Sequence, residues 1–426
     1  MARVFPFRAL RYDSARVSHQ QVLTQPYDKI TPAMQERYYR LSPYNLIRLE
    51  LGRTAPTDSP TENVYTRAAA ALREWRSEGV LGADPVPSLY VYTQDFSVPG
   101  GRESLQRRGF IALGQLEDYS TGIVFRHEQT HTGPKADRLN LLRATRAITG
   151  QVFMLYSDPA GEIDSLLQPS GSPATDVQDE YRVRHRMWPV CDSETLAAVQ
   201  RLMSDKRLII ADGHHRYETA LAYRDECRAA GRNGAGERLM MTFVNMDSPG
   251  LVILPTHRVL RGLPGFNADC FLNTAAQFFA VESLPPSADP ATVALREAGA
   301  HGTTILAATA SGQYLLRARP ADIDRFLADL SPQQRLLDVV QLHRVLLQHV
   351  LGISEHDIRE LKHIEYLRDP AEALIRVREG ADLAFLMNPV RIAQLRDVAF
   401  SGQVMPQKST DFYPKMLSGI AIYALD

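Results

Sequence analysis

Residues 208–217 read LIIADGHHRY and decide how this chain is interpreted. The apolar residues at their start predict a buried strand, Asp-Gly predicts a turn, and a helix is expected over residues 214–230. A helix that begins directly after a strand points its first backbone N–H groups, and the positive end of its dipole, at one spot. The stretch therefore predicts a strand–turn–helix unit with an anion site at the turn.

Each polar residue of this turn has a chemical reason to contact phosphate. Gly213 lets a ligand approach the backbone closely. Asp212 can cap the helix or hold a magnesium ion. Arg216 offers a fork of donors suited to phosphate oxygens, and His214 and His215 can donate to a phosphate or move protons near neutral pH. Any one of these could be an ordinary cap, turn or surface residue, whereas the whole set between a buried strand and a helix favours a functional site.

The composition is that of a soluble globular protein. The chain has 426 residues, 44% of them hydrophobic, and a net charge of -1 from 48 basic and 49 acidic residues. This balance excludes bulk electrostatic attraction to nucleic acid or to an anionic membrane. No apolar run approaches the roughly 20 residues of a membrane span, and the three separated cysteines fit a reducing compartment. We expect a cytoplasmic protein, and the sequence leaves its oligomeric state open.

Predicted strands and helices alternate along the chain, which indicates an α/β or α+β fold with a mixed sheet. We expect three parts: an N-terminal α/β domain with the turn (1–262), a small α/β module (263–332) and a C-terminal α/β segment that completes the fold (333–426). Alternating polarity predicts a strand over 45–51. Residues 157–180 are expected to form a surface loop, and a long helix is expected after residue 333.

Several stretches of the chain resemble motifs of the domain-of-unknown-function family 1015. The signature of that family is found at residues 210–220, around the turn. Further matches are Gln25-Pro26-Tyr27-Asp28, 42–49, His127-Glu128-x-Thr130, 137–144, Leu254-Pro255-Thr256-His257-Arg258 and Met405-Pro406-Gln407-Lys408-Ser409-Thr410. The resemblance spans almost the whole chain. It implies little about activity, because the family was named for its lack of a known function.

The turn also resembles, over a strand, a turn and a helix, one found in free-serine kinases of the ParB/sulfiredoxin-like superfamily. Those enzymes use the turn to hold nucleotide phosphates and phosphorylate L-serine with ADP or ATP. The resemblance implies a ParB/sulfiredoxin-like strand–turn–helix core with an additional C-terminal α/β module. It also implies a nucleotide, ADP or ATP, as co-substrate.

Residues 127–131 read HEQTH and match the zinc-protease pattern. That chemistry needs both histidines on one face of a stable helix and a third ligand downstream. The preceding residues are strand-like, Pro134 follows closely, and the extended pattern has Asp137 where the third histidine should stand. We therefore favour a strand-end loop that presents Glu128 as the base of a kinase, with Asp28 as its rival.

Further polar residues complete the predicted site. Phosphate contacts are expected from Arg138, on the helix after Pro134, and from Lys408, Ser409 and Thr410, which follow a near P-loop that has Gln407 in place of its second glycine. The residues expected to contact the substrate are Tyr27, Asp28, Asn45, Arg48 and His127.

The leading hypothesis is phosphoryl transfer from ADP or ATP to a small hydroxyl metabolite, with free L-serine as the favoured acceptor. The turn at 212–216 would hold the phosphates, Mg²⁺ would bind Asp212, and Glu128 would act as base. One alternative is a ParB-like regulatory module that binds a nucleotide without turnover. Another is a zinc-dependent hydrolase. The expected partners are a small-molecule substrate and a nucleotide, with no nucleic acid and no membrane.

Overall fold

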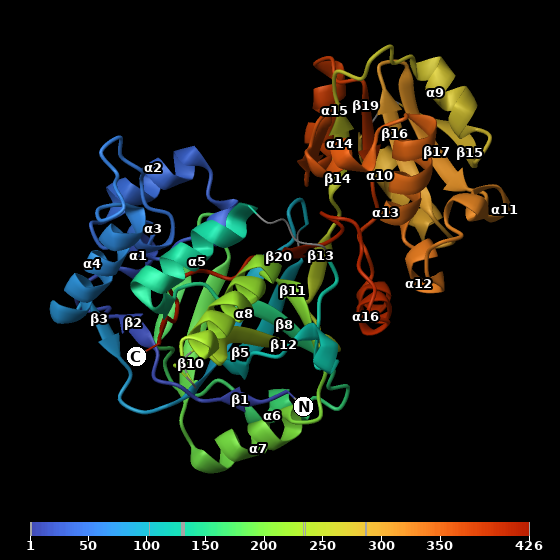
Figure 1. Cartoon of the computed structure of the whole chain (residues 1–426). Coiled ribbons are helices and arrows are strands. Elements are labelled where there is room, and N and C mark those ends of the chain that lie inside the picture. Colours follow the sequence, from blue (N-terminus) through green and yellow to red (C-terminus); the bar gives the residue numbers. More distant parts are fainter. Residues whose placement is uncertain are drawn as a thin grey trace. The chain divides into compact units, whose positions relative to one another are not determined.

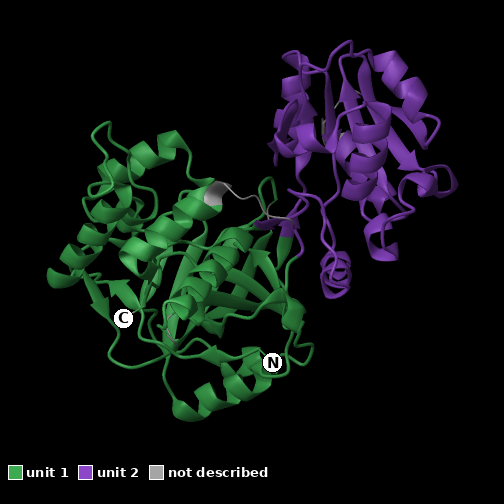
Figure 2. Ribbon diagram, in the orientation of Figure 1, with its two compact units in different colours: residues 1–126, 130–252, 413–426 green, residues 127–129, 253–412 purple. Residues whose placement is uncertain are grey.

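The computed structural model describes residues 2–101, 103–128, 133–232, 234, 236–285 and 288–425. The chain divides into two compact units, which Figure 2 colours separately. Unit 1 comprises residues 1–126, 130–252 and 413–426, and unit 2 comprises residues 127–129 and 253–412. The predicted module 263–332 and most of the predicted segment 333–426 thus belong to the same unit.

Unit 1 is built on a mixed sheet, which has nine strands within the described residues (Figure 1). In spatial order these are β6 (Val124–Phe125), β11 (Leu208–Asp212), β8 (Val152–Tyr156), β12 (Arg238–Asn245), β5 (Ser104–Gln115), β4 (Leu89–Ser97), β10 (Arg184–Val190) and β9 (Thr175–Gln178), with β1 (Val4–Phe5) paired to β5. Strand β11 runs parallel to β6 and antiparallel to β8, while β8 and β12 are parallel. The predicted mixed-sheet α/β class is confirmed.

Helices α5 (Gly133–Thr145) and α8 (His214–Ala229) pack side by side over this sheet, and α4 (Val64–Ser77) packs against α5 (Figure 1). Helices α6 (Glu162–Leu166) and α7 (Ser193–Met203) pack together, and α7 contacts β1. The smaller elements are β2 (Leu10–Tyr12), α1 (His19–Val22), η1 (Tyr27–Lys29), α2 (Pro32–Leu41), β3 (Leu81–Ala83), η2 (Tyr119–Thr121), β7 (Ala147–Ile148) and β21 (Tyr423–Ala424).

The strand–turn–helix unit forms where it was predicted. The apolar residues of β11 are all buried, and Leu208 and Ile210 share one core with β8, β12, α7 and the inner face of α8. A buried strand of this kind fixes the position of the turn that follows it, because neither of its faces can move without exposing apolar surface. Its assignment to the ParB/sulfiredoxin-like superfamily stays a prediction.

The strand predicted over 45–51 is wrong, because this segment contains helix α3 (Ile47–Glu50). The Asn45 side chain accepts a hydrogen bond from the Ile47 backbone N–H at 3.0 Å, a local turn that starts the helix. Ile47, Leu49 and Glu50 are all buried, so the alternating polarity does not separate a core face from a solvent face. The expected surface loop at 157–180 likewise contains α6 and β9.

Among its described residues, unit 2 has a sheet of six strands, and all neighbouring strands in it are antiparallel. Its order is β15 (Phe279–Leu284), β17 (Gly312–Ala318), β16 (Thr304–Thr309), β19 (Leu383–Leu386), β14 (His257–Leu260) and β18 (Ile364–Leu367). Helices α10 (Ala288–Gly299) and α15 (Pro370–Arg378) share a hydrophobic core with this sheet. The remaining helices are α9 (Ala268–Ala275), α11 (Pro320–Ile323), η3 (Asp324–Phe326), α14 (Glu355–Arg359) and α16 (Ile392–Phe400), and β13 (Val252–Leu254) pairs with β20 (Asp411–Tyr413).

The long helix predicted after residue 333 is divided into three. Helix α12 (Pro332–Arg335) ends at the exposed Leu336, α13 (Asp338–Gln341) follows, and a π-helix continues over η4 (Leu342–Val350). The apolar spacing predicts a helix correctly but carries no signal for the wider π pattern. Among the described residues, no helix combines the length and apolar character needed to cross a bilayer.

Candidate functional site

The turn between β11 and α8 is shaped by Gly213. Its φ is +94°, and a Cβ at this position would lie 3.2 Å from Cζ of Arg216. Both facts favour glycine, because other residues avoid this backbone conformation and the arginine needs the space. Gly213 is also the N-cap of α8 and has no side chain with which to cap the helix. The N-cap position is thus held by Gly213 and not by Asp212.

Asp212 instead holds two cations. Its Oδ2 accepts a hydrogen bond from Nη2 of Arg216 at 2.9 Å, and its Oδ1 accepts one from Nζ of Lys415 at 3.0 Å. Burial opposes the charged form of Asp212, but the charges of Lys415 and Arg216 outweigh it and hold the pKa of this carboxyl well below its usual range. Asp212 is ionised at neutral pH and fixes both cations beside the start of α8.

Arg216 links the turn to the Gln25–Asp28 motif. Besides Asp212, its guanidinium donates to the carbonyl of Gln151 and lies 3.9 Å from Oδ1 of Asp28. Burial favours the neutral form of Arg216, but the carboxylates of Asp212 and Asp28 outweigh it and raise the pKa. Arg216 thus keeps its charge although its side chain is only 13% exposed.

A second arginine lies near the same motif. The guanidinium of Arg138 packs over the ring of Tyr27, 4.5 Å from its centroid, and donates to the carbonyl of Glu50 at 2.6 Å. It also donates to Asp137 at 2.8 Å. Burial raises the pKa of Tyr27, so its hydroxyl stays protonated at neutral pH.

Tyr27, Arg138 and Arg216 border one pocket of unit 1, of about 480 Å³. The other residues that line it are Glu50, Leu141, Leu142, Ala147, Ile148, Thr149, Gly150, Thr219, Ala220 and Leu239. The lining therefore combines apolar side chains with two arginines and one carboxylate, that of Glu50. That combination suits a small ligand with an anionic group and a less polar body.

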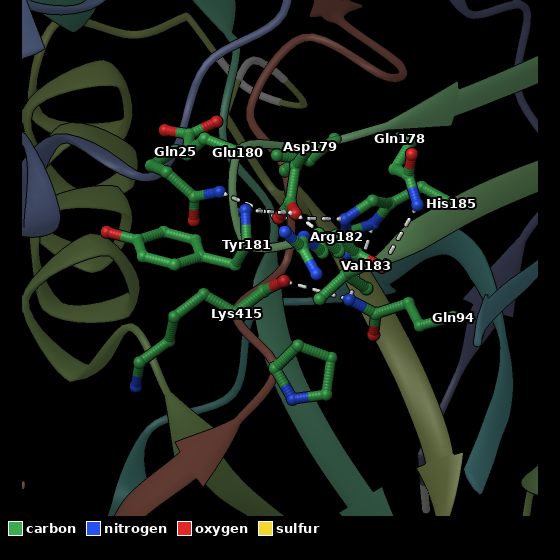
Figure 3. Close-up of polar contacts among 12 residues, drawn as sticks. Gln25, Gln94, Gln178, Asp179, Glu180, Tyr181, Arg182, Val183, His185 and Lys415 are labelled. Carbon is green, nitrogen blue, oxygen red and sulfur yellow. Dashed lines mark hydrogen bonds and ion pairs between the residues drawn. The ribbon is translucent and has the colours of Figure 1, made fainter. Parts of the chain in front are cut away.

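A buried polar network anchors the backbone on both sides of this site, as Figure 3 shows. Asp179 accepts hydrogen bonds from Nε2 of Gln25 at 2.9 Å and pairs with Nε2 of His185 at 3.2 Å. Gln94 contacts Nδ1 of His185 and donates to the carbonyl of Lys415 at 2.8 Å. The network therefore holds Gln25, three residues before Asp28, and the main chain of Lys415, whose side chain extends away from it (Figure 3).

The two histidines of the turn occupy the first positions of α8. His214 is 9% exposed and His215 is partly exposed. A histidine at a helix N-terminus is disfavoured in its charged form by the helix dipole. Their contact with a phosphate stays a prediction.

Another set of predicted residues meets in unit 2. Oε1 of Glu128 accepts hydrogen bonds from the backbone N–H groups of Ser409 and Thr410, at 3.1 and 3.0 Å, and from Oγ1 of Thr410 at 3.0 Å. His127 is fully buried and contacts the Thr410 hydroxyl through Nε2 at 2.7 Å. Lys408 is exposed and adopts a left-handed conformation, with φ of 56°. Glu128 thus orders the predicted loop 408–410, and its role as a base stays a prediction.

Two residues that were predicted to contact the substrate already contact neighbouring residues of the protein. Asn45 is completely buried and donates from Nδ2 to the carbonyl of Gln21 at 2.6 Å. Arg48 lies on helix α3, with its guanidinium 4.5 Å from the ring centroid of Tyr39. Both side chains stabilise the fold around α3, and we leave them out of the proposed site.

The predicted metals fit these residues poorly. Both oxygens of Asp212 already contact cations, so a magnesium ion there would have to displace Lys415 or Arg216. His127 and Glu128 do not lie on a helix, as the zinc-protease pattern requires, while His131 falls outside the described residues. No group of three or more His, Cys, Asp or Glu side chains that could hold a metal ion occurs in the described part of the chain.

Sequence reasoning missed Lys415, Gln151 and Glu50. Lys415 lies 203 residues from Asp212 along the chain, and only its place after the motif at 405–410 could have drawn attention to it. Gln151 contributes a backbone carbonyl, for which residue type gives no signal. Glu50 is a buried carboxylate that accepts a hydrogen bond from the Thr149 hydroxyl, and its alternation with apolar residues indicated an exposed position.

Several solved structures share a low similarity with the chain. A mutant free serine kinase in complex with ADP is 11% identical, has a TM-score of 0.35, and matches 68% of this chain and 84% of its own. A conserved hypothetical protein from Pyrococcus furiosus is 12% identical, with a TM-score of 0.35 and coverage of 71% and 92%. A C-terminally truncated SbnI from Staphylococcus aureus is 10% identical, with a TM-score of 0.37 and coverage of 72% and 85%. These scores are too low to transfer an activity to this chain.

The comparison of whole sequences is more decisive. A search of proteins with curated descriptions found no match to the chain. One family model matches residues 4–340, which include the turn, the Gln25–Asp28 motif, His127-Glu128 and the motif at 254–258. The chain therefore belongs to the family described as "Protein of unknown function (DUF1015)".

Proposed function

We propose that unit 1 binds the phosphates of a nucleotide at the β11–α8 turn, and that the protein transfers a phosphoryl group from ADP or ATP to a small hydroxyl metabolite. Free L-serine is the favoured acceptor. The observation that carries the proposal is the placement of Arg216 and Lys415, held by Asp212, at the start of a 16-residue helix whose N-cap is a glycine. Fixed cations and the positive end of a helix dipole are the features that bind phosphate.

The cations of the cluster at the turn are the groups that an anion would contact. Arg216 and Lys415 carry two positive charges, Asp212 and the nearby Asp28 carry two negative ones, and Lys29 adds a further positive charge near Asp212. Because Asp212 holds both cations before a ligand arrives, little side-chain freedom is lost on binding. The adjacent pocket would then take the part of the ligand beyond its phosphates, with Arg138 and Tyr27 at its border.

Transfer requires a carboxylate to accept the proton of the acceptor hydroxyl. Asp28 is the candidate within unit 1, since its carboxylate is 41% exposed and lies 3.9 Å from Arg216. Glu128, which the sequence also predicts as a base, belongs to unit 2, where its Oε1 accepts hydrogen bonds from the loop at 409–410. The acceptor oxygen would form a bond to the terminal phosphorus as the bond from phosphorus to the bridging oxygen breaks. The proton would pass to the carboxylate, and AMP would leave from ADP, or ADP from ATP.

Magnesium enters this proposal with the nucleotide. Mg²⁺ normally bridges nucleotide phosphates and neutralises the charge that develops during transfer. We assign it no protein ligand, because both oxygens of Asp212 are engaged with cations.

The test is a phosphoryl-transfer assay on the full chain, read by mass spectrometry. The protein is mixed with Mg²⁺, each of ADP, ATP and CTP, and a panel of hydroxylated metabolites that includes L-serine. We expect phosphoserine in the presence of ADP or ATP, and at least a 100-fold loss of rate in Arg216→Ala. The matched control is Arg228→Ala, which removes an exposed arginine from the same helix, where it pairs with Glu237.

Asp28→Asn and Glu128→Gln identify the base. The variant that loses the rate while it still binds nucleotide has lost the proton acceptor. Turnover at the wild-type rate in Arg216→Ala would overturn the proposal.

The second candidate function is nucleotide binding without turnover, as in a ParB-like regulatory module. The observation that favours it is that carboxylate oxygens of both Asp212 and Glu128 are engaged in contacts within the protein. Tight nucleotide binding that Arg216→Ala abolishes, with no product for any acceptor, would select this function.

A further inference from the structure

Arg258, on strand β14 of unit 2, is a charged side chain that is almost completely buried, with an exposed fraction of 2%. Its Nη1 donates to the carbonyl of Thr256, and its Nη2 donates to the carbonyl of Lys408 at 3.2 Å. Its guanidinium packs against the ring of Tyr366, 5.3 Å from the centroid. Among the described residues, its Nε has no hydrogen-bond partner.

The charge of Arg258 is not matched by a carboxylate at close range. Within the described residues, Arg258 forms no ion pair. Glu128 acts on it only from a greater distance, and Oε1 of Glu128 is already used by the loop at 409–410. A buried charge that contacts only neutral carbonyl groups is unfavourable unless an anion joins it.

The two histidines near Arg258 add no compensating charge. Burial, helped by the charge of Arg258, lowers the pKa of His257 to about 4 and that of His343 to about 3. Both rings are therefore neutral at pH 7. Nδ1 of His257 accepts a hydrogen bond from the backbone N–H of Met387 at 3.1 Å, so its proton is on Nε2, which has no partner within the described chain. Two donors in this region, Nε of Arg258 and Nε2 of His257, therefore have no acceptor within the described residues.

Arg258 lines a small pocket in unit 2. The polar residues that share the lining include Thr256, Asp338, Asn388, Arg391 and Ser409. Arg391 supplies a second positive charge from the start of α16, where it is exposed. Asp338 is the one carboxylate among the lining residues, and burial raises its pKa to about 6, which weakens its repulsion of an anion in mildly acidic solution.

We propose that this pocket is a second ligand site, which binds a small oxyanion, a phosphate or a carboxylate group, with Arg258 as its buried partner and Arg391 at its edge. The guanidinium of Arg258 is planar and presents its donors in a fixed fork, which matches two oxygens of one ligand. Thr256 and Asn388 offer further polar groups beside it.

The site gives a role to two stretches that the function proposed for unit 1 leaves unexplained. Thr256, His257 and Arg258 belong to the motif at 254–258, and Ser409 belongs to the motif at 405–410. The carbonyl of Lys408 also holds Arg258 in place. The proposal does not depend on phosphoryl transfer, since all of its residues lie in unit 2.

The experiment is a calorimetric titration of the full chain with inorganic phosphate and, separately, with acetate. It is done in an Arg216→Ala background, so that the turn in unit 1 does not contribute. We expect one site for at least one of the two anions, and about tenfold weaker binding when Arg391→Ala is added, the loss of one charge-assisted hydrogen bond. Binding of phosphate alone indicates a phosphate ligand, and binding of acetate alone indicates a carboxylate.

Two further variants make the result decisive. Arg258→Met removes the buried charge and should abolish binding, provided that its thermal unfolding shows a folded protein. Arg396→Ala is the matched control, because this exposed arginine lies on the same helix as Arg391 and pairs with Asp397. No binding of either anion, or affinity that is unchanged in the Arg391→Ala variant, would overturn the proposal.

Discussion

The two units of this protein treat a buried arginine in opposite ways. In unit 1, Arg216 contacts Asp212 and lies close to Asp28, and a neighbouring network pairs Asp179 with His185. In unit 2, Arg258 is buried more deeply but contacts only carbonyl oxygens and an aromatic ring. The difference shows that a buried charge can be a part of the fold in one place and an incomplete binding site in another.

The largest effect is expected from breaking the paired network of unit 1. Asp179→Asn leaves His185 and Gln25 without a charged acceptor in a buried position, and should lower the free energy of unfolding by about 3–5 kcal/mol. Urea unfolding measures this loss. The control is Asp176→Asn on β9, an exposed carboxylate paired with Arg184, for which less than about 1 kcal/mol is expected. Equal losses in both variants would show that the network does not anchor unit 1.

The next prediction concerns Arg216. Arg216→Met leaves Asp212 in contact with Lys415 but without the guanidinium, and it removes the hydrogen bond to the carbonyl of Gln151. We expect unit 1 to lose about 2–4 kcal/mol. Hydrogen–deuterium exchange of peptides from β8 and β11 measures this loss of stability locally. Unchanged exchange in both strands would contradict the structural part of this role.

The same substitution in unit 2 should act in the other direction. Arg258→Met removes a buried charge that has no close carboxylate, and without an anion in solution we expect unit 2 to gain about 1–2 kcal/mol or to stay unchanged. Hydrogen–deuterium exchange of peptides from β14 and β19 measures this change in stability. A loss as large as that of Arg216→Met would mean that Arg258 is compensated within the protein, which removes the distinction between the units.

The smallest expected effect is a pH dependence in unit 2. Burial raises the pKa of Asp338 to about 6, against the opposing contributions of a hydrogen bond to Thr303 and the charge of Arg391. Since the folded pKa lies above the unfolded one, the stabilisation is complete below about pH 4 and is lost as the pH rises through 6. Partial exposure limits this to about 1–2 kcal/mol.

Asp338→Asn should remove this pH-dependent loss of stability and leave the titration of the other groups unchanged. Thermal unfolding of wild type and variant at pH 4.5, 6 and 8 tests it, and the difference between them should grow in favour of the variant with rising pH. A constant difference across the three pH values would rule out Asp338 as the titrating group.

Much of the fold could be predicted from local signals. The apolar run before Asp212 and the glycine after it place β11 and α8 correctly. The segment 45–51 could not be assigned in this way. Apolar residues and Glu50 of α3 are buried alike, so the polarity pattern does not indicate which residues face the core. Nor does apolar spacing distinguish the π-helix at 342–350 from an ordinary helix.

The site was predictable only where chemistry and sequence coincide. The turn showed Asp212, Gly213 and Arg216 as neighbours, and these residues are in contact in the structure. Lys415 reaches Asp212 from the far end of the chain, and a single sequence carries no signal for a contact of that range. Asn45 and Arg48 were chosen by residue type, which cannot show that neighbouring groups already occupy their polar atoms.

The central claim is that the β11–α8 turn holds nucleotide phosphates, and a calorimetric titration with ADP and Mg²⁺ tests it most directly. Three proteins are compared: wild type, Arg216→Ala and the helix control Arg228→Ala. We predict one nucleotide per chain for wild type and Arg228→Ala, with binding weakened by about 100-fold in Arg216→Ala, the loss of a buried charge-assisted contact. Equal affinity in all three proteins, or no binding by the folded wild type, would contradict the account.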